Sequence, residues 1–140
     1  MSFWLPLEAT SRAAGLEYVR GSHRWGRWFQ PSFPRRDGPP PSEDPRFAPV
    51  PDIEGERDRH ELLSWDMAPG DLVAYHGLTL HGTLRGATAP HRRSVWETRW
   101  CGEDVRFANR VGPITPRLEG HGLSAGDRFG GTMFPKAWPR

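Results

Sequence analysis

The residues with the clearest chemical potential in this sequence are His81, Thr83 and Arg92. His81 and Thr83 are two positions apart, so on an extended strand their side chains point to the same face. Imidazole is a common ligand of divalent metal ions. An arginine fork beside a hydroxyl group can hold a carboxylate through charge-assisted hydrogen bonds. Such a set could bind a dicarboxylic co-substrate between a metal ion and the arginine.

Spacing alone leaves two interpretations of these residues open. If 84–90 connects two strands as a hairpin, the strands are neighbours, and His81, Thr83 and Arg92 share one cavity. Otherwise His81 and Arg92 are exposed side chains that flank a loop. The remaining histidines, which are ordinary surface or core residues unless their spacing indicates more, are His23, His60, His76, His91 and His121.

Short strands separated by turns must position these side chains. Strands are expected over 2–8, 16–19, 72–76, 78–83 and 92–100. The pair Pro69-Gly70 predicts a type II turn just before the third of them. Glycine and proline, 16 and 15 of the 140 residues, are unfavourable in helix interiors. We therefore expect a mainly β fold, arranged as a sandwich or barrel.

Three segments are not expected to add regular β structure. Residues 31–51 hold eight of the fifteen prolines, and a loop of this length is either a lid over a site or a disordered insertion. Residues 55–64 are charged and form one short helix or a turn. The chain is rich in glycine and proline after Cys101. We expect a single domain over 1–140, with a proline-rich loop or lid over 31–60 and an irregular tail over 101–140.

Composition argues against several classes of protein. The net charge is only +2, and 19 basic side chains are interspersed with 17 acidic ones, so the basic stripe of a nucleic-acid-binding surface is not present. A single cysteine, Cys101, excludes an internal disulfide and a cysteine zinc cluster. No apolar stretch is long enough to span a membrane, and residues 1–7 do not resemble a signal peptide. A cytoplasmic protein is expected.

The order of several short motifs is more specific than any one of them. The motifs are Phe3-Trp4-Leu5-Pro6-Leu7-Glu8, Gly15-Leu16, Tyr18-Val19-Arg20-Gly21-Ser22-His23, Pro69-Gly70-Asp71, His81-Gly82-Thr83, Arg92-Arg93, Arg99-Trp100, and Gly126-Asp127 with Phe134-Pro135. Together they resemble the phytanoyl-CoA dioxygenase family of non-haem iron(II), 2-oxoglutarate-dependent oxygenases. The resemblance covers most of the chain. It implies a jelly roll (double-stranded β-helix), hydroxylation of a small organic substrate, and Fe(II) and 2-oxoglutarate as cofactors.

The resemblance also implies roles for individual residues. His81 is the iron ligand, and Arg92 binds the far carboxylate of 2-oxoglutarate with help from Thr83. Trp4 lines the co-substrate pocket. Arg93 is the rival of Arg92. Strand alternation puts the two arginines on opposite faces, and the family's spacing of eleven residues after the histidine selects Arg92.

Two other histidines have competing interpretations. His76 is a weaker candidate ligand, because Leu78 and not a hydroxyl-bearing residue stands two positions after it. A cupin-type metal enzyme that uses His76 and His81 together is a further hypothesis. His23 lies in the Gly-Ser-His turn, where we expect it to orient the loop.

Two iron ligands that the resemblance implies are missing. In the family they form His-x-Asp or His-x-Glu on an earlier strand and complete a triad of two histidines and one carboxylate. The residues two positions after the six histidines are Trp25, Leu62, Leu78, Thr83, Arg93 and Leu123, and none is acidic. We therefore expect the C-terminal part of a jelly roll: a fragment, half of a split protein or a natural pseudoenzyme. Its exposed sheet edges would favour self-association. The alternative is a catalytically inactive jelly-roll module for binding or assembly.

Overall fold

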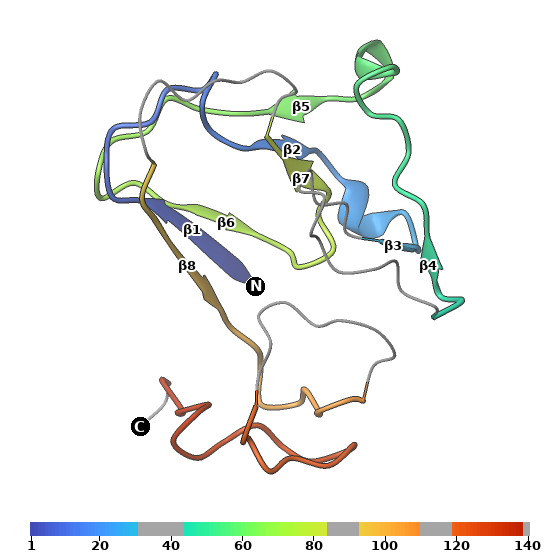
Figure 1. Ribbon diagram of the computed structural model, residues 1–140, viewed down its shortest axis with the longest axis vertical. Helices are drawn as coiled ribbons and strands as arrows, with labels where there is room; N and C mark the ends of the chain where they lie inside the picture. The colour runs from blue at the N-terminus through green and yellow to red at the C-terminus, as the bar shows by residue number, and fades with distance from the viewer. Residues whose placement is uncertain (31–43, 84–92, 110–118, 139–140) are drawn as a thin grey trace. The chain divides into compact units, whose positions relative to one another are not determined.

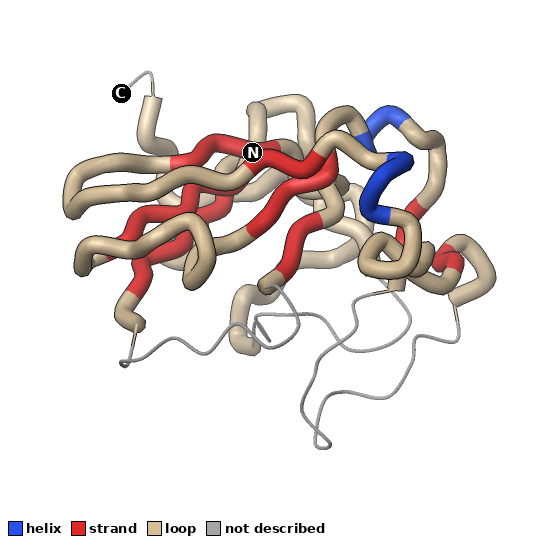
Figure 2. Tube along the Cα trace, turned by 90° about the horizontal axis from the view of Figure 1, so that it is seen from above, coloured by secondary structure: helices blue, strands red, loops and turns tan. Residues whose placement is uncertain are grey.

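The computed structural model describes residues 1–30, 44–83, 93–109 and 119–138 (Figure 1). The chain forms two compact units. Unit 1 comprises Met1–Phe29 and Ala48–Trp100, and unit 2 comprises Gln30–Phe47 and Cys101–Arg140. Strands and loops dominate the described residues, and the helices among them are two single 3-10 turns (Figure 2). The expected all-β class is confirmed.

The first sheet of unit 1 is built around the N-terminal strand. Its order is β6 (Val73–Tyr75), β1 (Ser2–Pro6) and β8 (Val95–Arg99). Both pairings are antiparallel, and Trp4 lies opposite Val73 on one side and Glu97 on the other. Ser2, Trp4 and Pro6 are buried, and the residues between them are partly exposed. This alternation follows from the period of two along a strand, so one face of β1 belongs to the core.

The second sheet of unit 1 carries the candidate histidine. Its order is β5 (Leu62–Leu63), β2 (Glu17–Val19) and β7 (His81–Gly82), with both pairings antiparallel. Tyr18 lies opposite His81 in one pairing and Leu63 in the other. Directly opposed residues of antiparallel strands share a face. The aromatic rings of Tyr18 and His81 are therefore brought together by strand register.

Shorter elements complete the described part of the chain. They are β3 (Trp28–Phe29) paired with β4 (Phe47–Ala48), and the 3-10 turns η1 (Ser22–Arg24) and η2 (Arg57–Arg59). The charged stretch 55–64 thus forms a helical turn, as expected. No helix among the described residues has the length and apolar character that crossing a membrane requires. Residues 31–43 of the expected lid lie outside the described residues.

The core of unit 1 is an aromatic cluster between the two sheets. Trp4 and Tyr75 come from the first sheet and Tyr18 from the second. The ring centroids of Tyr18 and Tyr75 are 5.1 Å apart, a separation at which aromatic pairs are favourable beyond their burial by about 0.5–1.5 kcal/mol. The partly buried side chains packed around this cluster are Leu16, Leu63, Met67 and Val73.

The buried hydroxyl of Ser22 connects the Gly-Ser-His turn to the strand that carries the candidate histidine. It donates to the carbonyl of Val19 at 2.8 Å and accepts from the amide of Leu80 at 2.9 Å. Gly21 before it has a φ of 76°, in the left-handed region that favours glycine. The turn motif therefore fixes the backbone immediately before His81.

The strand positions expected from the sequence are confirmed, and the hairpin interpretation is wrong. Strands occur within each of the five expected segments, although each is shorter than expected. However, β7 pairs with β2 and β8 pairs with β1, so the two strands belong to different sheets. Each strand instead takes as its partner a strand from the first twenty residues, because packing across the core decides the pairing. The connection 84–92 lies outside the described residues.

Unit 2 is mostly irregular in its described part. Its described part has an isolated bridge between Arg106 and Arg128, and the amide of Phe107 donates to the carbonyl of Asp127 at 2.9 Å. Phe107 and His121 have ring centroids 4.7 Å apart. Further aromatic contacts extend this cluster to Phe129 and Phe134. Contacts between aromatic side chains therefore stabilise the described part of the tail more than strand pairing does.

Candidate functional site

His81 lies against the aromatic core with part of its ring exposed. Its ring stacks on Tyr18, with centroids 5.7 Å apart and planes 22° apart. The ring centroid of Tyr75 is 4.8 Å away. Both tyrosines are buried, whereas His81 itself is exposed. The core therefore orients the imidazole while leaving it accessible from solvent.

The hydrogen bond of His81 leaves one ring nitrogen available. Nδ1 lies 2.8 Å from the carbonyl oxygen of Thr79. A carbonyl oxygen only accepts, so Nδ1 carries a proton, and in the neutral ring Nε2 then keeps its lone pair. Metal-bound histidines commonly donate their other ring N–H to a backbone carbonyl in this way. This arrangement leaves Nε2 of His81 as the ring nitrogen able to accept a metal ion.

His76 has the opposite arrangement. Its Nδ1 accepts a hydrogen bond from the amide of Leu78 at 3.1 Å. In the neutral ring the proton is then on Nε2, and neither nitrogen offers a lone pair. The ring of His76 lies beside that of His23, with centroids 5.3 Å apart. The geometry favours His81 over His76 as a ligand and gives no support to the cupin-type hypothesis.

An arginine lies over the ring of Trp4. The guanidinium carbon of Arg93 is 5.6 Å from the centroid of the Trp4 ring, within the range of a cation–π contact worth about 0.5–2 kcal/mol. Arg93 also donates to the carbonyl of Ala14. The amide of Leu7 donates to the carbonyl of Ser94 at 3.0 Å, which continues the β1–β8 pairing toward Arg93.

The structure places three of the four site residues expected from the sequence. Trp4 and His81 both contribute to the aromatic region of unit 1. Thr83 follows β7 and is exposed. Arg92 lies outside the described residues, so its role stays a prediction. Among the described residues, the arginine that approaches Trp4 is its neighbour Arg93.

Sequence reasoning missed a polar group beside this cluster. The hydroxyl of Tyr75 donates to Oε1 of Glu97 at 3.0 Å, and Arg99 pairs with the same oxygen at 2.9 Å. Tyr18 and Tyr75 are the only two tyrosines in the sequence. Their placement at inward positions of two predicted strands was the available signal. It would have indicated that both phenols face the core.

Burial changes the acidity of both phenols. It raises the pKa of Tyr75 to about 12, and the negative charge of Glu97 adds to the effect. Burial also raises the pKa of Tyr18, with further contributions from Tyr75 and Glu97, and Arg93 acts in the opposite direction. Both hydroxyl groups therefore stay protonated near neutral pH.

We predict that unit 1 unfolds at high pH as these phenols ionise. A group whose pKa is raised on folding stabilises the fold fully below its unfolded value, and this stability is lost as pH rises through the folded value. For Tyr75 the window lies between its ordinary pKa of 10.0 and about 12, with a loss of at most roughly 3 kcal/mol. Tyrosinate absorbance and circular dichroism, followed together, should change in this window. Ionisation of both tyrosines near pH 10 with the fold intact would contradict the prediction.

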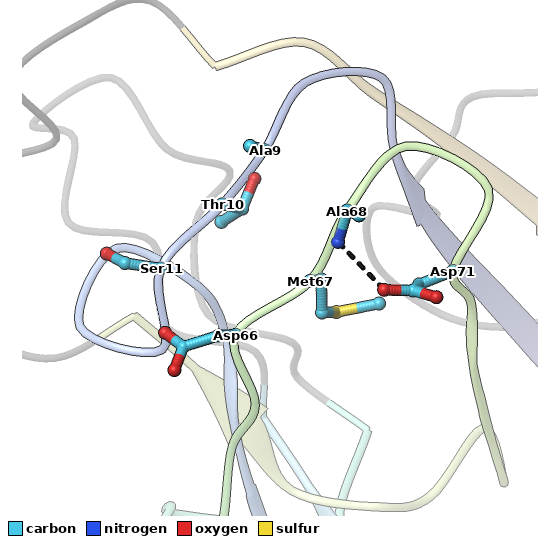
Figure 3. Close-up of a pocket in the computed structure, with 7 residues that line it drawn as sticks. All are labelled: Ala9, Thr10, Ser11, Asp66, Met67, Ala68 and Asp71. Atoms are coloured by element: carbon cyan, nitrogen blue, oxygen red, sulfur yellow. Dashed lines mark hydrogen bonds between the residues drawn. The ribbon is translucent and has the colours of Figure 1, made fainter.

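A hollow in the surface of unit 1 is not the candidate site. It is lined by Ala9, Thr10, Ser11, Asp66, Met67, Ala68 and Asp71 (Figure 3). Its two carboxylates already accept backbone hydrogen bonds, Asp66 from the amide of Arg12 and Asp71 from that of Ala68, each at 2.7 Å. The second bond closes the expected turn, in which Gly70 has a φ of 102°. The hollow is a junction of two loops.

The described residues fit the two groups implied by the resemblance unequally. His81 offers iron(II) one nitrogen, but no group of three His, Cys, Asp or Glu side chains is found within the described ranges. A complete triad is therefore not available there. A carboxylate fits better, because Arg93 supplies a cation. The buried hydroxyl of Tyr18 also has no hydrogen-bond partner in the described part of the chain.

Comparison with known proteins identifies the family of the chain. The family model for phytanoyl-CoA dioxygenase (PhyH) matches residues 1–94, a range that contains Trp4, Tyr18, His81 and Arg93. No curated protein and no solved structure matches the chain. The family resemblance of the sequence is thus confirmed. Because the match spans well over half of the 140 residues, the chain belongs to the phytanoyl-CoA dioxygenase family.

Proposed function

We propose that this chain forms the 2-oxoglutarate-binding side of an iron(II)- and 2-oxoglutarate-dependent dioxygenase that hydroxylates a small organic substrate. The observation that carries the proposal is the arrangement of His81. Its Nδ1 is hydrogen-bonded to the backbone carbonyl of Thr79, and in the neutral ring its Nε2 has a lone pair. Its ring packs on the aromatic cluster that contains Trp4. Family membership supports the same class of enzyme.

In this proposal each residue has one task. His81 holds the metal ion through Nε2. As the family resemblance implies, and without a hairpin between their strands, Arg92 and Thr83 bind the far carboxylate of 2-oxoglutarate. Arg93 is the alternative cation for that carboxylate, because it lies over Trp4. An arginine is suited to this task because its planar fork can make two charge-assisted bonds to a carboxylate. Trp4 excludes water from that end of the co-substrate.

The experiment that tests the proposal is calorimetric titration of the chain with 2-oxoglutarate, with and without cobalt(II) as an oxygen-stable substitute for iron(II). We expect binding that cobalt(II) strengthens, because 2-oxoglutarate chelates the metal ion and so adds donors to the single imidazole. If the chain does not bind 2-oxoglutarate either with or without cobalt(II), the proposal is wrong.

A second candidate is a catalytically inactive jelly-roll module for binding or assembly. It is favoured by the sequence, in which no histidine is followed two positions later by an acidic residue. The two candidates differ in product formation. With iron(II), oxygen and 2-oxoglutarate, the enzyme releases succinate, and the inactive module binds the dicarboxylate without releasing any.

We further propose that the two antiparallel sheets belong to a jelly roll and that the protein is cytoplasmic. We also propose that the chain self-associates. Trp96 and Trp100 on and after β8 are 60% and 48% exposed, and exposed apolar area beside a sheet edge favours association. Sedimentation at increasing concentration tests this point. A mass that stays monomeric at every concentration contradicts self-association without affecting the proposed enzyme class.

A further inference from the structure

The hydroxyl of Tyr18 is a buried donor that has no hydrogen-bond partner within the described ranges. Tyr18 is 4% exposed, and its oxygen has no hydrogen bond among the described residues. The neighbouring phenol differs, because the hydroxyl of Tyr75 donates to Glu97 at 3.0 Å. Buried polar groups are bonded in the great majority of cases, and an exception calls for an explanation. A ligand that supplies an acceptor is one such explanation.

The surroundings of Tyr18 indicate what kind of ligand fits. Its ring stacks on that of His81, with centroids 5.7 Å apart, so the phenol lies beside the proposed metal ligand. Arg93 lies 5.6 Å from the ring of Trp4, which belongs to the same core cluster as Tyr18. The nearby carboxylate of Glu97 is already paired with Arg99 at 2.9 Å. A negatively charged acceptor that reaches both residues would form an ion pair with Arg93 and accept a hydrogen bond from Tyr18.

We propose that Tyr18 is a positioning residue whose hydroxyl donates a hydrogen bond to the carboxylate of a small dicarboxylate, at the end of the ligand that faces Arg93. This inference rests on the proposed function and adds a recognition group to it. A phenol hydroxyl is protonated across the neutral range, so the donor is present there. A charge-assisted bond of this kind is stronger than one between neutral groups.

The substitution Tyr18→Phe isolates the hydroxyl, because it leaves the ring that stacks on His81 in place. Calorimetric titration with 2-oxoglutarate in the presence of cobalt(II) should show an affinity about 10- to 100-fold lower than that of the unmodified chain, the usual range for a lost bond to a charged group. The melting temperature should be unchanged or higher, because the variant removes an unpaired buried polar group.

The matched control is Tyr75→Phe, which removes the other phenol of the cluster. That hydroxyl already donates a hydrogen bond to Glu97. Its loss should therefore lower the melting temperature and leave the affinity for 2-oxoglutarate nearly unchanged. A second control is the ligand 2-oxobutyrate, which keeps the keto acid but has no second carboxylate. Tyr18→Phe should cause no comparable loss of affinity for this ligand.

The outcomes separate this inference from the proposed function. If the unmodified chain does not bind 2-oxoglutarate, the proposed function fails and the role of Tyr18 fails with it. If the chain binds and Tyr18→Phe binds equally well, only the role of Tyr18 is overturned. That role is also overturned if Tyr18→Phe lowers both the affinity and the melting temperature, as a purely structural change would. It is likewise overturned if the variant weakens the binding of 2-oxobutyrate as much as that of 2-oxoglutarate.

Discussion

The variant His81→Ala is expected to lose cobalt(II) binding in the presence of 2-oxoglutarate. Removal of a group that only orients a metal ligand costs about 10- to 100-fold in metal affinity, so removal of the ligand itself should cost more than about 100-fold. His81 has the lone pair that a metal ion requires, because its Nδ1 proton is donated to Thr79. Competition against a chromophoric chelator measures the change.

The control for this prediction is His76→Ala. His76 is also exposed and lies five positions earlier, but its Nδ1 accepts from Leu78, so its loss should leave metal affinity unchanged. Because His81 packs on Tyr18 and Tyr75, His81→Gln should be compared as a variant of similar size. If His76→Ala is the variant that loses the metal, the ligand assignment is wrong and the cupin-type arrangement regains support.

Replacement of Trp4 by alanine is expected to destabilise unit 1 strongly. Trp4 is 4% exposed at the centre of the core cluster, and truncating a buried Trp or Phe to alanine costs about 3–5 kcal/mol. Small domains have about 5–15 kcal/mol of stability in total, so the loss is a large share of it. The variant also removes the ring that faces Arg93. Urea denaturation followed by circular dichroism measures the effect.

Trp96→Ala is the matched control for the core position. Trp96 lies on β8, opposite Leu5 of β1, and is 60% exposed. Substitutions at such surface positions usually change stability by less than about 0.5 kcal/mol. Equal destabilisation by the two variants would show that the face of β1 assigned to the core is the wrong one. Retention of 2-oxoglutarate binding by Trp96→Ala would show that the effect of Trp4 is local to the core.

The sequence alone determined the strands, the faces of their side chains and the candidate ligand. The strands at 2–6, 17–19, 73–75 and 95–99 lie within expected segments, because a period of two is a local property of the chain. The prediction that Ser22 and Gly21 form a turn is also local, since it depends on neighbouring residues. The spacing of His81, Thr83 and Arg92, together with the family resemblance, predicts His81 as the ligand.

Only the tertiary structure decided which strands are partners and which side chains meet. The sequence suggested a hairpin between the strands of His81 and Arg92, but β7 and β8 lie in different sheets. Nor does the sequence specify the proton on Nδ1 of His81 or the unpartnered hydroxyl of Tyr18. These features depend on long-range packing of Trp4, Tyr18 and Tyr75 between the sheets. Residues far apart in the chain then become neighbours, and no local pattern records such contacts.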